Sequence, residues 1–343
     1  MKCMDYINEE LNDENYHNYI EKHGVKKFCK LLVEKIPHLT GLHLCERINI
    51  SNNEIKLIAE FLKKYESNNL NSHLISLHLR NNYIDDNGIK FITNSLSINK
   101  YIKFLILGNN DITENGAKYI AEFLIINKSL TELYLSENLI NVNGAKYIAE
   151  ALRVNKSLEI LYLGSNNIGD EGVKFIAESL KNSKSHLTKL YIDNNSISNK
   201  GCEFIADFLK TNKYLKTLNL EKNNFDDKGV KFIVESLTMC DLESSRSHLI
   251  TLDLRYNNIG DEGIESIIKL LKINRSLTNV YLYLYFYSDL NFEKFNLMTD
   301  LLDINRINKE KIKKERANEK IYLHFYMQNN YWQFLEFFDE LSY

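Results

Sequence analysis

LEILYLGSNNIGDEGVKFIAESL, residues 158–180, carries two hydrophobic periods in one short segment. Leu161 and Leu163 alternate with other residues, which is the period of a β-strand, whereas Ile176 and Leu180 recur at the spacing of one α-helical face. The intervening SNNIG is rich in residues that favour turns. The segment therefore predicts one strand, one turn and one helix.

The same segment recurs along the chain. Its copies begin at Leu74, Ile102, Leu130, Leu158, Leu187, Leu215, Leu249 and Leu277. The spacing is nearly constant at about 28 residues, with a longer interval only before Leu249, and a fixed period in this range indicates a solenoid. Because each helix must return the chain to a strand of the same direction, the pattern predicts a parallel sheet with helices on one side.

An asparagine follows every strand in the same register: Asn82, Asn110, Asn138, Asn166, Asn195, Asn223 and Asn257. The side-chain amide both donates and accepts hydrogen bonds, so it can pair turn backbone groups that leave the sheet inside the solenoid. An unpaired buried backbone group costs about 1–3 kcal/mol. We therefore interpret this asparagine ladder as structural.

The heptapeptide NNIGDEG occurs twice, at 166–172 and 257–263. A calcium loop needs oxygen ligands at alternating positions, whereas this segment offers a single Asp-Glu pair. Asp170 and Asp261 stand two residues before a glycine, within one position of residues in sister repeats that suit helix N-caps, namely Asp85, Thr113, Asn141, Ser198 and Asp226. We interpret both aspartates as N-caps of their own helices rather than as metal ligands.

The ends of the chain depart from the repeat. Residues 1–38 are expected to form a helical cap with half a repeat, and residues 39–290 the repeats: an irregular unit at 39–73, seven regular repeats at 74–276 and a degenerate last strand at 277–290. Residues 291–343 should contain a charged, solvated helix at 305–320, then a last strand (IYLHFY) and an aromatic capping helix.

Composition narrows the function classes. The 343-residue chain is 44% hydrophobic and 26% charged, so it can bury a core. Its net charge of -3 argues against nucleic-acid binding, and its apolar runs are too short to span a membrane. Five scattered cysteines and an acidic N-terminal segment favour reduced thiols and a cytoplasmic location.

A candidate binding face follows from the strand alternation. Residues that flank the inward leucines point out of the concave side of the sheet. Aromatic, aliphatic and charged side chains at these positions have the composition of a protein-binding surface. The candidate partner-binding residues are Arg80, Phe104, Ile106, Glu132, Tyr134, Ile160, Tyr162, Tyr191, Asp193, Asp253, Arg255, Tyr281 and Tyr283. The alternative is that tyrosines here only stabilise the strands by stacking.

Two other series have a structural interpretation. Phe91, Tyr119, Tyr147, Phe175, Phe204 and Phe232 each lie three residues after a repeat glycine, which indicates packing between repeats. His43 and His78 share a register on neighbouring strands, with Cys45 nearby, but a zinc site requires a further sure ligand. We therefore expect neither metal nor cofactor.

The pattern L-x-x-L-x-L-x-x-N-x-I with G-x-x-x-I-A-E-x-L resembles the leucine-rich repeat family, and its period resembles the ribonuclease-inhibitor-type subclass. The resemblance implies an α/β horseshoe solenoid, with a parallel concave β-sheet and convex α-helices. Motifs for nucleophilic, metal or phosphate chemistry are missing from the sequence.

These observations favour a non-catalytic, monomeric module that binds an unidentified protein partner through its concave face and its C-terminal aromatic end. One alternative is a GTPase-activating regulator similar to Ran GTPase-activating proteins, for which Arg80 is the candidate arginine. Another is a pathogen effector that binds a host protein.

Overall fold

The computed structural model describes residues 19–20, 22–35, 39–45, 50–67, 74–181, 185–242, 248–282, 293–294 and 296–311. Its strands are short and follow one per repeat: β1 Gly41–His43, β2 Ser76–His78, β3 Phe104–Ile106, β4 Glu132–Tyr134, β5 Ile160–Tyr162, β6 Lys189–Tyr191, β7 Thr217–Asn219, β8 Thr251–Asp253 and β9 Asn279–Tyr281. Tyr283, the IYLHFY segment and the aromatic segment after it lie outside the described residues.

The helices alternate with these strands. They are α2 Val25–Lys35, α3 Asn52–Ser67, α4 Asp86–Leu96, α5 Glu114–Ile126, α6 Asn141–Leu152, α7 Gly169–Leu180, α8 Asn199–Leu209, α9 Asp227–Leu242 and α10 Asp261–Ile273, and a further helix covers 296–311. No helix among the described residues is long and apolar enough to cross a membrane.

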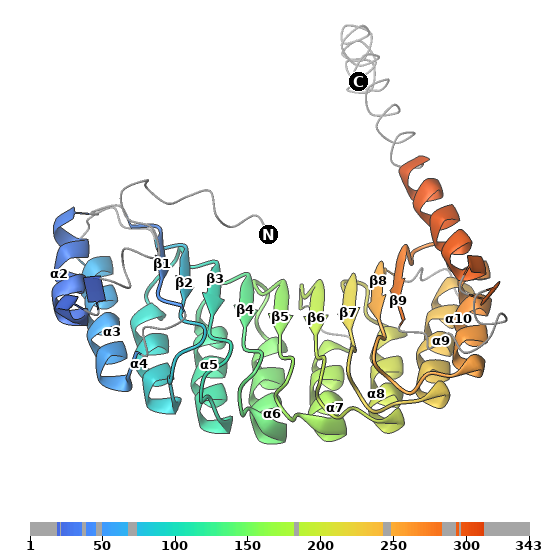
Figure 1. The fold of residues 1–343 in the computed structure, drawn as a ribbon, viewed down its shortest axis with the longest axis horizontal. Coiled ribbons are helices and arrows are strands. Elements are labelled where there is room, and N and C mark those ends of the chain that lie inside the picture. Colours follow the sequence, from blue (N-terminus) through green and yellow to red (C-terminus); the bar gives the residue numbers. More distant parts are fainter. Residues whose placement is uncertain are drawn as a thin grey trace, which may run out of the picture.

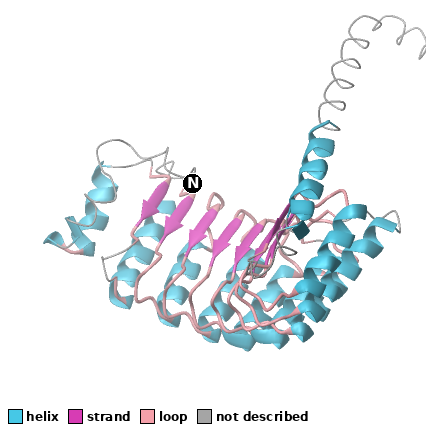
Figure 2. Cartoon of the chain, turned by 45° about the vertical axis from the view of Figure 1, so that its right-hand side comes forward, coloured by secondary structure: helices cyan, strands magenta, loops and turns pink. Residues whose placement is uncertain are grey.

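The strands form one parallel sheet in sequence order, β1 to β9. Figure 1 shows this sheet along the inner side of an arc and the helices along the outer side, and Figure 2 shows the same two layers from a second direction. The register advances by one repeat at each step, so that Leu133 pairs with Leu161 and Leu161 with Leu190. The predicted α/β solenoid is confirmed.

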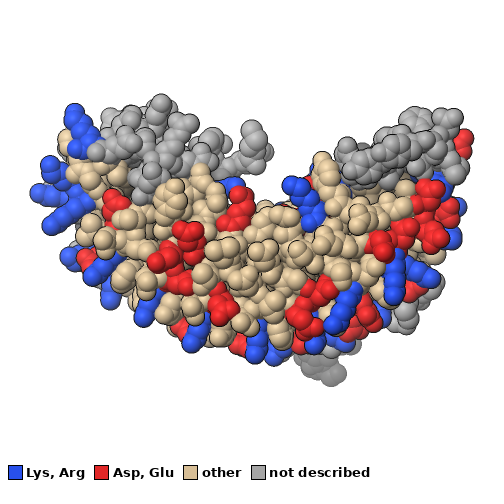
Figure 3. Space-filling model, turned by 60° about the horizontal axis from the view of Figure 1, so that its bottom comes forward, with Lys and Arg blue, Asp and Glu red and all other residues tan. Residues whose placement is uncertain are grey.

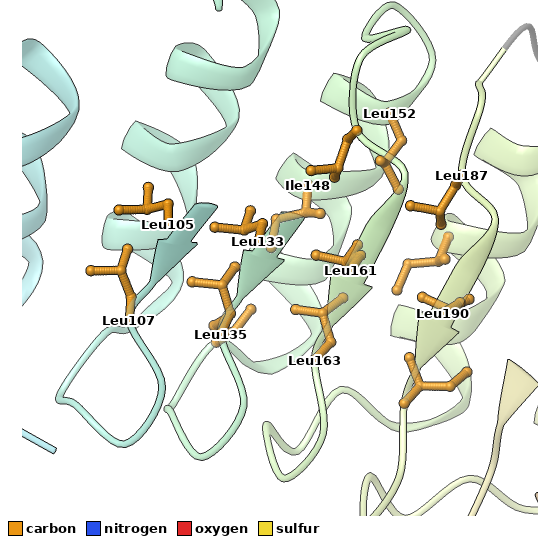
Figure 4. Packing of buried hydrophobic residues seen from close by; sticks show 14 of the residues in the cluster. Leu105, Leu107, Leu133, Leu135, Ile148, Leu152, Leu161, Leu163, Leu187 and Leu190 are labelled. Atoms are coloured by element: carbon orange, nitrogen blue, oxygen red, sulfur yellow. The ribbon is translucent and has the colours of Figure 1, made fainter. Parts of the chain in front are cut away.

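The core lies between the sheet and the helices. Each strand buries its central residue, and most strands leave the two flanking residues half-buried, as β5 does with Ile160 and Tyr162 on either side of Leu161. Figure 4 shows the strand leucines in rows, with Ile148 and Leu152 of α6 among them. Burial of one such side chain contributes about 1.5–3 kcal/mol, so the rows stabilise the stack of repeats.

The predicted asparagine ladder is present. The Asn166 amide is fully buried, and its Nδ2 donates to the carbonyls of Leu135, Leu163 and Gly164 at 2.8–3.1 Å. Its Oδ1 accepts from the backbone N–H of Ile140 at 3.3 Å. Since Leu135 and Ile140 belong to the preceding repeat, each amide joins two repeats as well as closing its own turn.

A second asparagine ladder lies at the other end of the helices. Asn127 follows α5, and its Oδ1 accepts from the N–H groups of Ser129 and Leu130 while its Nδ2 donates to the carbonyl of Asn99 in the preceding repeat. The equivalent turn residues are Asn99, Asn155, Asn212 and Asn274. In these repeats, both rims of the solenoid are therefore closed by amide side chains.

The predicted caps are confirmed at four helices and wrong at others. Asp85, Thr113, Ser198 and Asp226 each accept a hydrogen bond from the first turn of their own helix. Asp170, in contrast, lies in the first turn of α7, and its carboxylate accepts from the backbone N–H of Ser198 at 2.8 Å and from its Oγ at 2.5 Å. It therefore supports the start of α8 in the next repeat.

Helix starts depend on the preceding repeat. Asp227 Oδ1 accepts from the N–H of Gly260 at 2.6 Å, and Gly260 is extended with φ -103°. In the repeat before α7, the residue equivalent to Asp227 is Val142, whose side chain offers no hydrogen-bond acceptor. Gly169, the residue equivalent to Gly260, takes φ +59° and donates to the carbonyl of Asn195. The two copies of NNIGDEG thus adopt different backbones because their neighbours differ.

The Asp261 interpretation is also corrected. Gly260, rather than Asp261, occupies the N-cap position of α10, and no side chain caps this helix. The Asp261 carboxylate is exposed and lies 3.8 Å from Lys294 Nζ. Asn141 caps nothing either, because α6 begins at this residue with φ +57° and without a side-chain cap bond.

The expected charged, solvated helix at 305–320 is described only to residue 311, and residues 312–320 lie outside the described residues. Residues 306–311 are helical and exposed as expected, but the helix extends further toward the N-terminus than predicted. It covers 296–311 and buries Met298, Leu302 and Asn305. Asn305 Nδ2 donates to the carbonyls of Asn274 and Leu277, and Arg306 Nε donates to the carbonyl of Thr278 at 2.9 Å. This helix therefore packs on the last repeat. The Arg306 side chain donates there to a carbonyl that, in the earlier repeats, accepts from backbone N–H groups of the next repeat.

Replacement of Asn166 by alanine should lower the free energy of unfolding by about 1–3 kcal/mol, because it leaves buried carbonyls unpaired. The matched control is Asn224→Ala, since Asn224 is exposed. Urea denaturation of both variants measures the difference. Equal midpoints for the two variants and the wild type would show that the ladder is not stabilising.

The repeated heptapeptide supplies a second matched pair. Asp170→Ala removes the acceptor for Ser198 and should cost about 0.5–2 kcal/mol, as for other lost helix caps. Asp261→Ala, at the same position of an identical segment, removes a surface ion pair and should change stability by less than about 0.5 kcal/mol. Thermal denaturation would contradict this account if the two variants lost the same stability.

Candidate functional site

Three tyrosines form a continuous stack at the centre of the concave face. Tyr134, Tyr162 and Tyr191 are in register on β4, β5 and β6, with ring centroids 4.1 and 4.2 Å apart and interplanar angles of 13° and 10°. All three are half-buried. Their spacing follows from the roughly 4.8 Å separation of neighbouring strands. We refer to these three side chains as the tyrosine stack.

The outer rings of the tyrosine stack, Tyr134 and Tyr191, have perturbed environments. Tyr134 Oη donates to Glu132 Oε2 at 2.9 Å, which lies two residues earlier on the same strand. Burial raises the pKa of Tyr134 and of Tyr191 above the ordinary range for tyrosine. The stack therefore presents its rings in one arrangement, which suits contact with a preformed surface.

Apolar side chains lie beside the tyrosine stack on β3 and on β5. Ile106 pairs in register with Tyr134, and Phe104 of the same strand pairs with Glu132. Ile160 lies on β5 beside Glu132 and Lys189. Phe104, Ile106 and Ile160 are all half-buried on the concave face, as the strand alternation predicts.

Acidic groups lie on the other side of the tyrosine stack. Burial, with the charges of Glu221 and Asp253, raises the pKa of Asp193. The Asp193 carboxylate lies over the backbone of Gly164, where an added Cβ would collide with its oxygens. Glycine at 164 therefore leaves room for this carboxylate directly beside the tyrosine stack.

Arg255 neutralises acidic groups at the C-terminal half of the face. Its Nε and Nη2 donate to the Asp253 carboxylate at 2.6–3.1 Å, and Nη2 also donates to Glu221 Oε2 at 2.9 Å. Its guanidinium lies 5.5 Å from the Tyr281 ring centroid. Asp253 was expected to be available on the face, but it is buried beneath this arginine.

Arg80 lies at the N-terminal half of the face, after β2. Its Nη2 donates to Glu137 Oε1 at 2.8 Å, which belongs to the turn two repeats further along. Glu137 is not among the residues predicted from the sequence, because the pairing crosses the curved surface rather than following one register. The arginine is exposed and ion-paired.

His43 and His78 stack face to face, with centroids 3.8 Å apart and an interplanar angle of 6°. His43 Nε2 lies 3.4 Å from Ser76 Oγ. Burial and the adjacent His43 lower the pKa of His78 to about 4. Within the described part of the chain, no three His, Cys, Asp or Glu side chains are grouped so that they could hold a metal ion.

The aromatic series on the helices is packed against the core as predicted. Phe91, Tyr119, Tyr147, Phe175 and Phe204 are partly buried there. Lysines of the preceding helix cover several of these rings, with Lys90 Nζ 5.3 Å from the Tyr119 centroid and Lys146 Nζ 5.8 Å from the Phe175 centroid. This series joins neighbouring helices and lies away from the concave face.

The repeat pattern matches a protein-family model described as "Leucine Rich repeat". Seven segments match, at residues 70–92, 99–121, 127–149, 154–177, 183–206, 211–234 and 246–267. The chain belongs to the leucine-rich repeat family. Each matched segment contains one asparagine of the ladder that follows the strands, so the family pattern and the hydrogen bonding coincide.

No curated protein matches this leucine-rich repeat chain in sequence. Among solved structures, the chain is similar to leiomodin-1 actin-binding site 2, with a TM-score of 0.38, 19% identity and coverage of 60% of this chain and 96% of that chain. It is also similar to a tropomodulin C-terminal domain from Caenorhabditis elegans, with a TM-score of 0.35, 16% identity and coverage of 58% and 98%. Similarity at this level identifies no partner.

The histidine pair predicts a pH dependence of stability. The pKa of His78 is about 4 in the folded chain and 6.5 ordinarily, so the unfolded chain binds more protons between these values. Stability should therefore fall as the pH falls through this interval. We expect His78→Asn to reduce the dependence of the free energy of unfolding on pH, as measured by urea denaturation. His186→Asn, at an exposed histidine, is the control. An unaltered slope in His78→Asn would contradict the assignment.

Proposed function

We propose that this chain is a non-catalytic module that binds a protein partner on its concave face, with the tyrosine stack as the central contact. The stack supports this proposal because three large, half-buried aromatic rings lie in one register on a sheet whose other face is fully packed. Tyrosine contributes a large contact area at a low cost in rotamer entropy, and aromatic anchors near the centre of an interface commonly dominate binding.

The arrangement favours a preformed site. Neighbouring backbones hold the strands on both sides, and the tyrosine stack restricts its own rings, so little ordering is required on binding. The distribution of side chains also indicates the partner. An apolar segment would contact the tyrosine stack with Ile106 and Ile160, and a basic group would meet Asp193, whose carboxylate forms no ion pair within the described residues.

The same proposal includes the repeat subclass, the cellular location, the oligomeric state and the C-terminal contact. A repeat of about 28 residues with one strand and one helix supports the ribonuclease-inhibitor-type subclass. We take the protein to be cytoplasmic and monomeric. Cys29 and Cys202 are buried thiols, and burial raises the pKa of Cys29 to about 12, which accords with a reducing compartment. The candidate residue Tyr281 is exposed at the C-terminal end of the sheet and would extend the contact there.

The GTPase-activating alternative depends on Arg80. An arginine that acts in trans must reach a bound nucleotide, whereas the Arg80 guanidinium is paired with Glu137. Addition of the protein to a Ran-like GTPase tests this alternative directly. We expect unchanged GTP hydrolysis, and acceleration that is lost in Arg80→Ala would favour the alternative.

The tyrosine stack provides the main test of partner binding. A partner is first captured from native lysate with the intact chain and identified, and its affinity is then measured for wild type and Tyr162→Ala. Loss of a central aromatic anchor commonly costs about 2 kcal/mol or more, so affinity should fall by about thirtyfold or more. Tyr83→Ala, at an exposed tyrosine away from the sheet, is the matched control.

The triple variant Tyr134→Ala/Tyr162→Ala/Tyr191→Ala distinguishes binding from strand stabilisation. If the tyrosine stack is a contact surface, partner recovery should be lost while urea denaturation shows a folded chain. If the stack only supports the sheet, stability should fall while partner recovery persists. The second result would exclude the concave face as we have assigned it.

A further inference from the structure

A row of exposed aliphatic side chains lies at the C-terminal ends of three consecutive helices, α4, α5 and α6. Ile98, Ile126 and Val154 are 51%, 63% and 50% exposed. Each precedes the buried asparagine that closes its helix, at Asn99, Asn127 and Asn155. We call these three residues the aliphatic row.

The aliphatic row is not required by the fold. The turn after α8 is closed by Asn212 in the same way, with Oδ1 accepting from the Leu215 N–H, and the residue before it is the exposed Thr211. A polar residue at this position is therefore compatible with the same turn. Ile125 and Tyr101, 45% and 43% exposed, widen the row in the same segments. Single exposed apolar residues are ordinary, but three in register form a strip with one side chain per repeat.

The aliphatic row lies on a basic rim. In the turn segments 97–103, 125–131, 153–159, 210–216 and 272–278, Glu159 is the single acidic residue, whereas the basic residues are Lys100, Lys103, Lys128, Arg153, Lys156, Lys210, Lys213, Lys216, Lys272 and Arg275. Lys100 and Lys156, beside the row, are exposed and form no ion pair within the described residues. Basic side chains interact favourably with helix C-termini. That interaction explains the lysines and arginines of this rim but not its exposed aliphatic residues.

The opposite rim carries an excess of acidic groups. There the strand ends and helix starts contribute Asp85, Asp86, Asp111, Glu114, Glu137, Asp170, Glu171, Asp226, Asp227, Asp261 and Glu262. In the view of Figure 3, basic and acidic side chains alternate along the lower edge of the molecule, while uncharged side chains cover much of the middle. The rim that carries the aliphatic row thus combines exposed aliphatic side chains with exposed lysines, whereas acidic side chains predominate at the opposite rim.

We propose that the aliphatic row and its flanking lysines bind an acidic amphipathic helix of a protein partner. Neighbouring packed helices lie about 8–10 Å apart, so the row offers one aliphatic contact per repeat at about that interval. An α-helix rises about 1.5 Å per residue, so apolar residues seven apart recur at intervals of about 10 Å on one face. Acidic residues beside those positions would meet Lys100, Lys128 and Lys156.

A protein helix fits this rim better than an anionic membrane does. Glu122 and Glu150 lie four residues before Ile126 and Val154, and both glutamates are exposed. A helix about 10 Å across can follow the aliphatic row without covering these glutamates. A planar anionic bilayer would bring its headgroups against them, and like charges would then repel.

The test uses the full chain and two synthetic helical peptides. Both carry leucine at every seventh position, and their flanking residues are glutamate in one peptide and lysine in the other. Fluorescence anisotropy should show binding of the glutamate peptide, weakened by salt, and at least tenfold weaker binding of the lysine peptide. Ile98→Ser/Ile126→Ser/Val154→Ser should weaken glutamate-peptide binding at least tenfold, whereas Ile273→Ser, at the same position of a later repeat, should not.

A second variant keeps the test independent of folding. Lys100→Glu/Lys156→Glu changes only exposed side chains and should reverse the preference between the two peptides. Equal binding of both peptides by the wild type, or glutamate-peptide binding that the serine variant retains, would overturn the proposal. Two further results would overturn it. One is binding of phosphatidylserine vesicles, but not of the peptide, that the serine variant loses. The other is self-association of the chain that the serine variant abolishes.

Binding at the rim should not depend on the concave face. The Tyr134→Ala/Tyr162→Ala/Tyr191→Ala variant should bind the glutamate peptide like the wild type. Loss of peptide binding in that variant, with the fold intact, would place the peptide on the concave face instead and overturn the rim assignment.

Discussion

Everything in this solenoid depends on pairing the backbone groups of turns that are buried between repeats. Short strands leave the sheet after three residues, and the chain must then turn inside the protein, where unpaired carbonyl and N–H groups are costly. One asparagine per repeat satisfies several of them at once and also reaches into the preceding repeat. The leucine rows and the regular sheet register can form only because these turns are paired, and the positions of the concave side chains follow from that register.

The closure of both rims by amides also allows different surfaces of the molecule to carry different side chains. The hydrogen bonds leave the outward residues of each turn free to vary, and helix ends favour acidic groups at one rim and basic groups at the other. The concave face combines the tyrosine stack with the half-buried Asp193, whereas the basic rim combines lysines with aliphatic residues. Two surfaces of different chemistry are thus produced by the same repeat, without any change to its packing.

Sequence periodicity was sufficient to predict the solenoid, the asparagine ladder and the outward direction of Tyr134, Tyr162 and Tyr191, because these depend on spacing within one repeat. It failed where a contact depends on how side chains meet in three dimensions, either between repeats or within one repeat. Asp170 fits a cap of its own helix by position, yet its carboxylate reaches Ser198 of the next repeat. Asp253 fits an outward residue by alternation, yet Arg255 covers it. The second amide ladder escaped notice although an N-x-S-L pattern recurs, since burial of Asn127 and Asn155 is visible only in three dimensions.

The unequal backbones of the two NNIGDEG copies limit how freely this array could be rearranged by recombination. A repeat that follows Val142 must begin its helix through a left-handed residue, and Gly169 adopts that conformation without strain. A unit such as the one beginning at Leu187 would bring Ser198 to that place, where a serine in the left-handed region costs roughly 1–2 kcal/mol. Duplication or exchange of units would therefore be tolerated only in certain orders, so the array behaves as a sequence of dependent neighbours rather than as interchangeable modules.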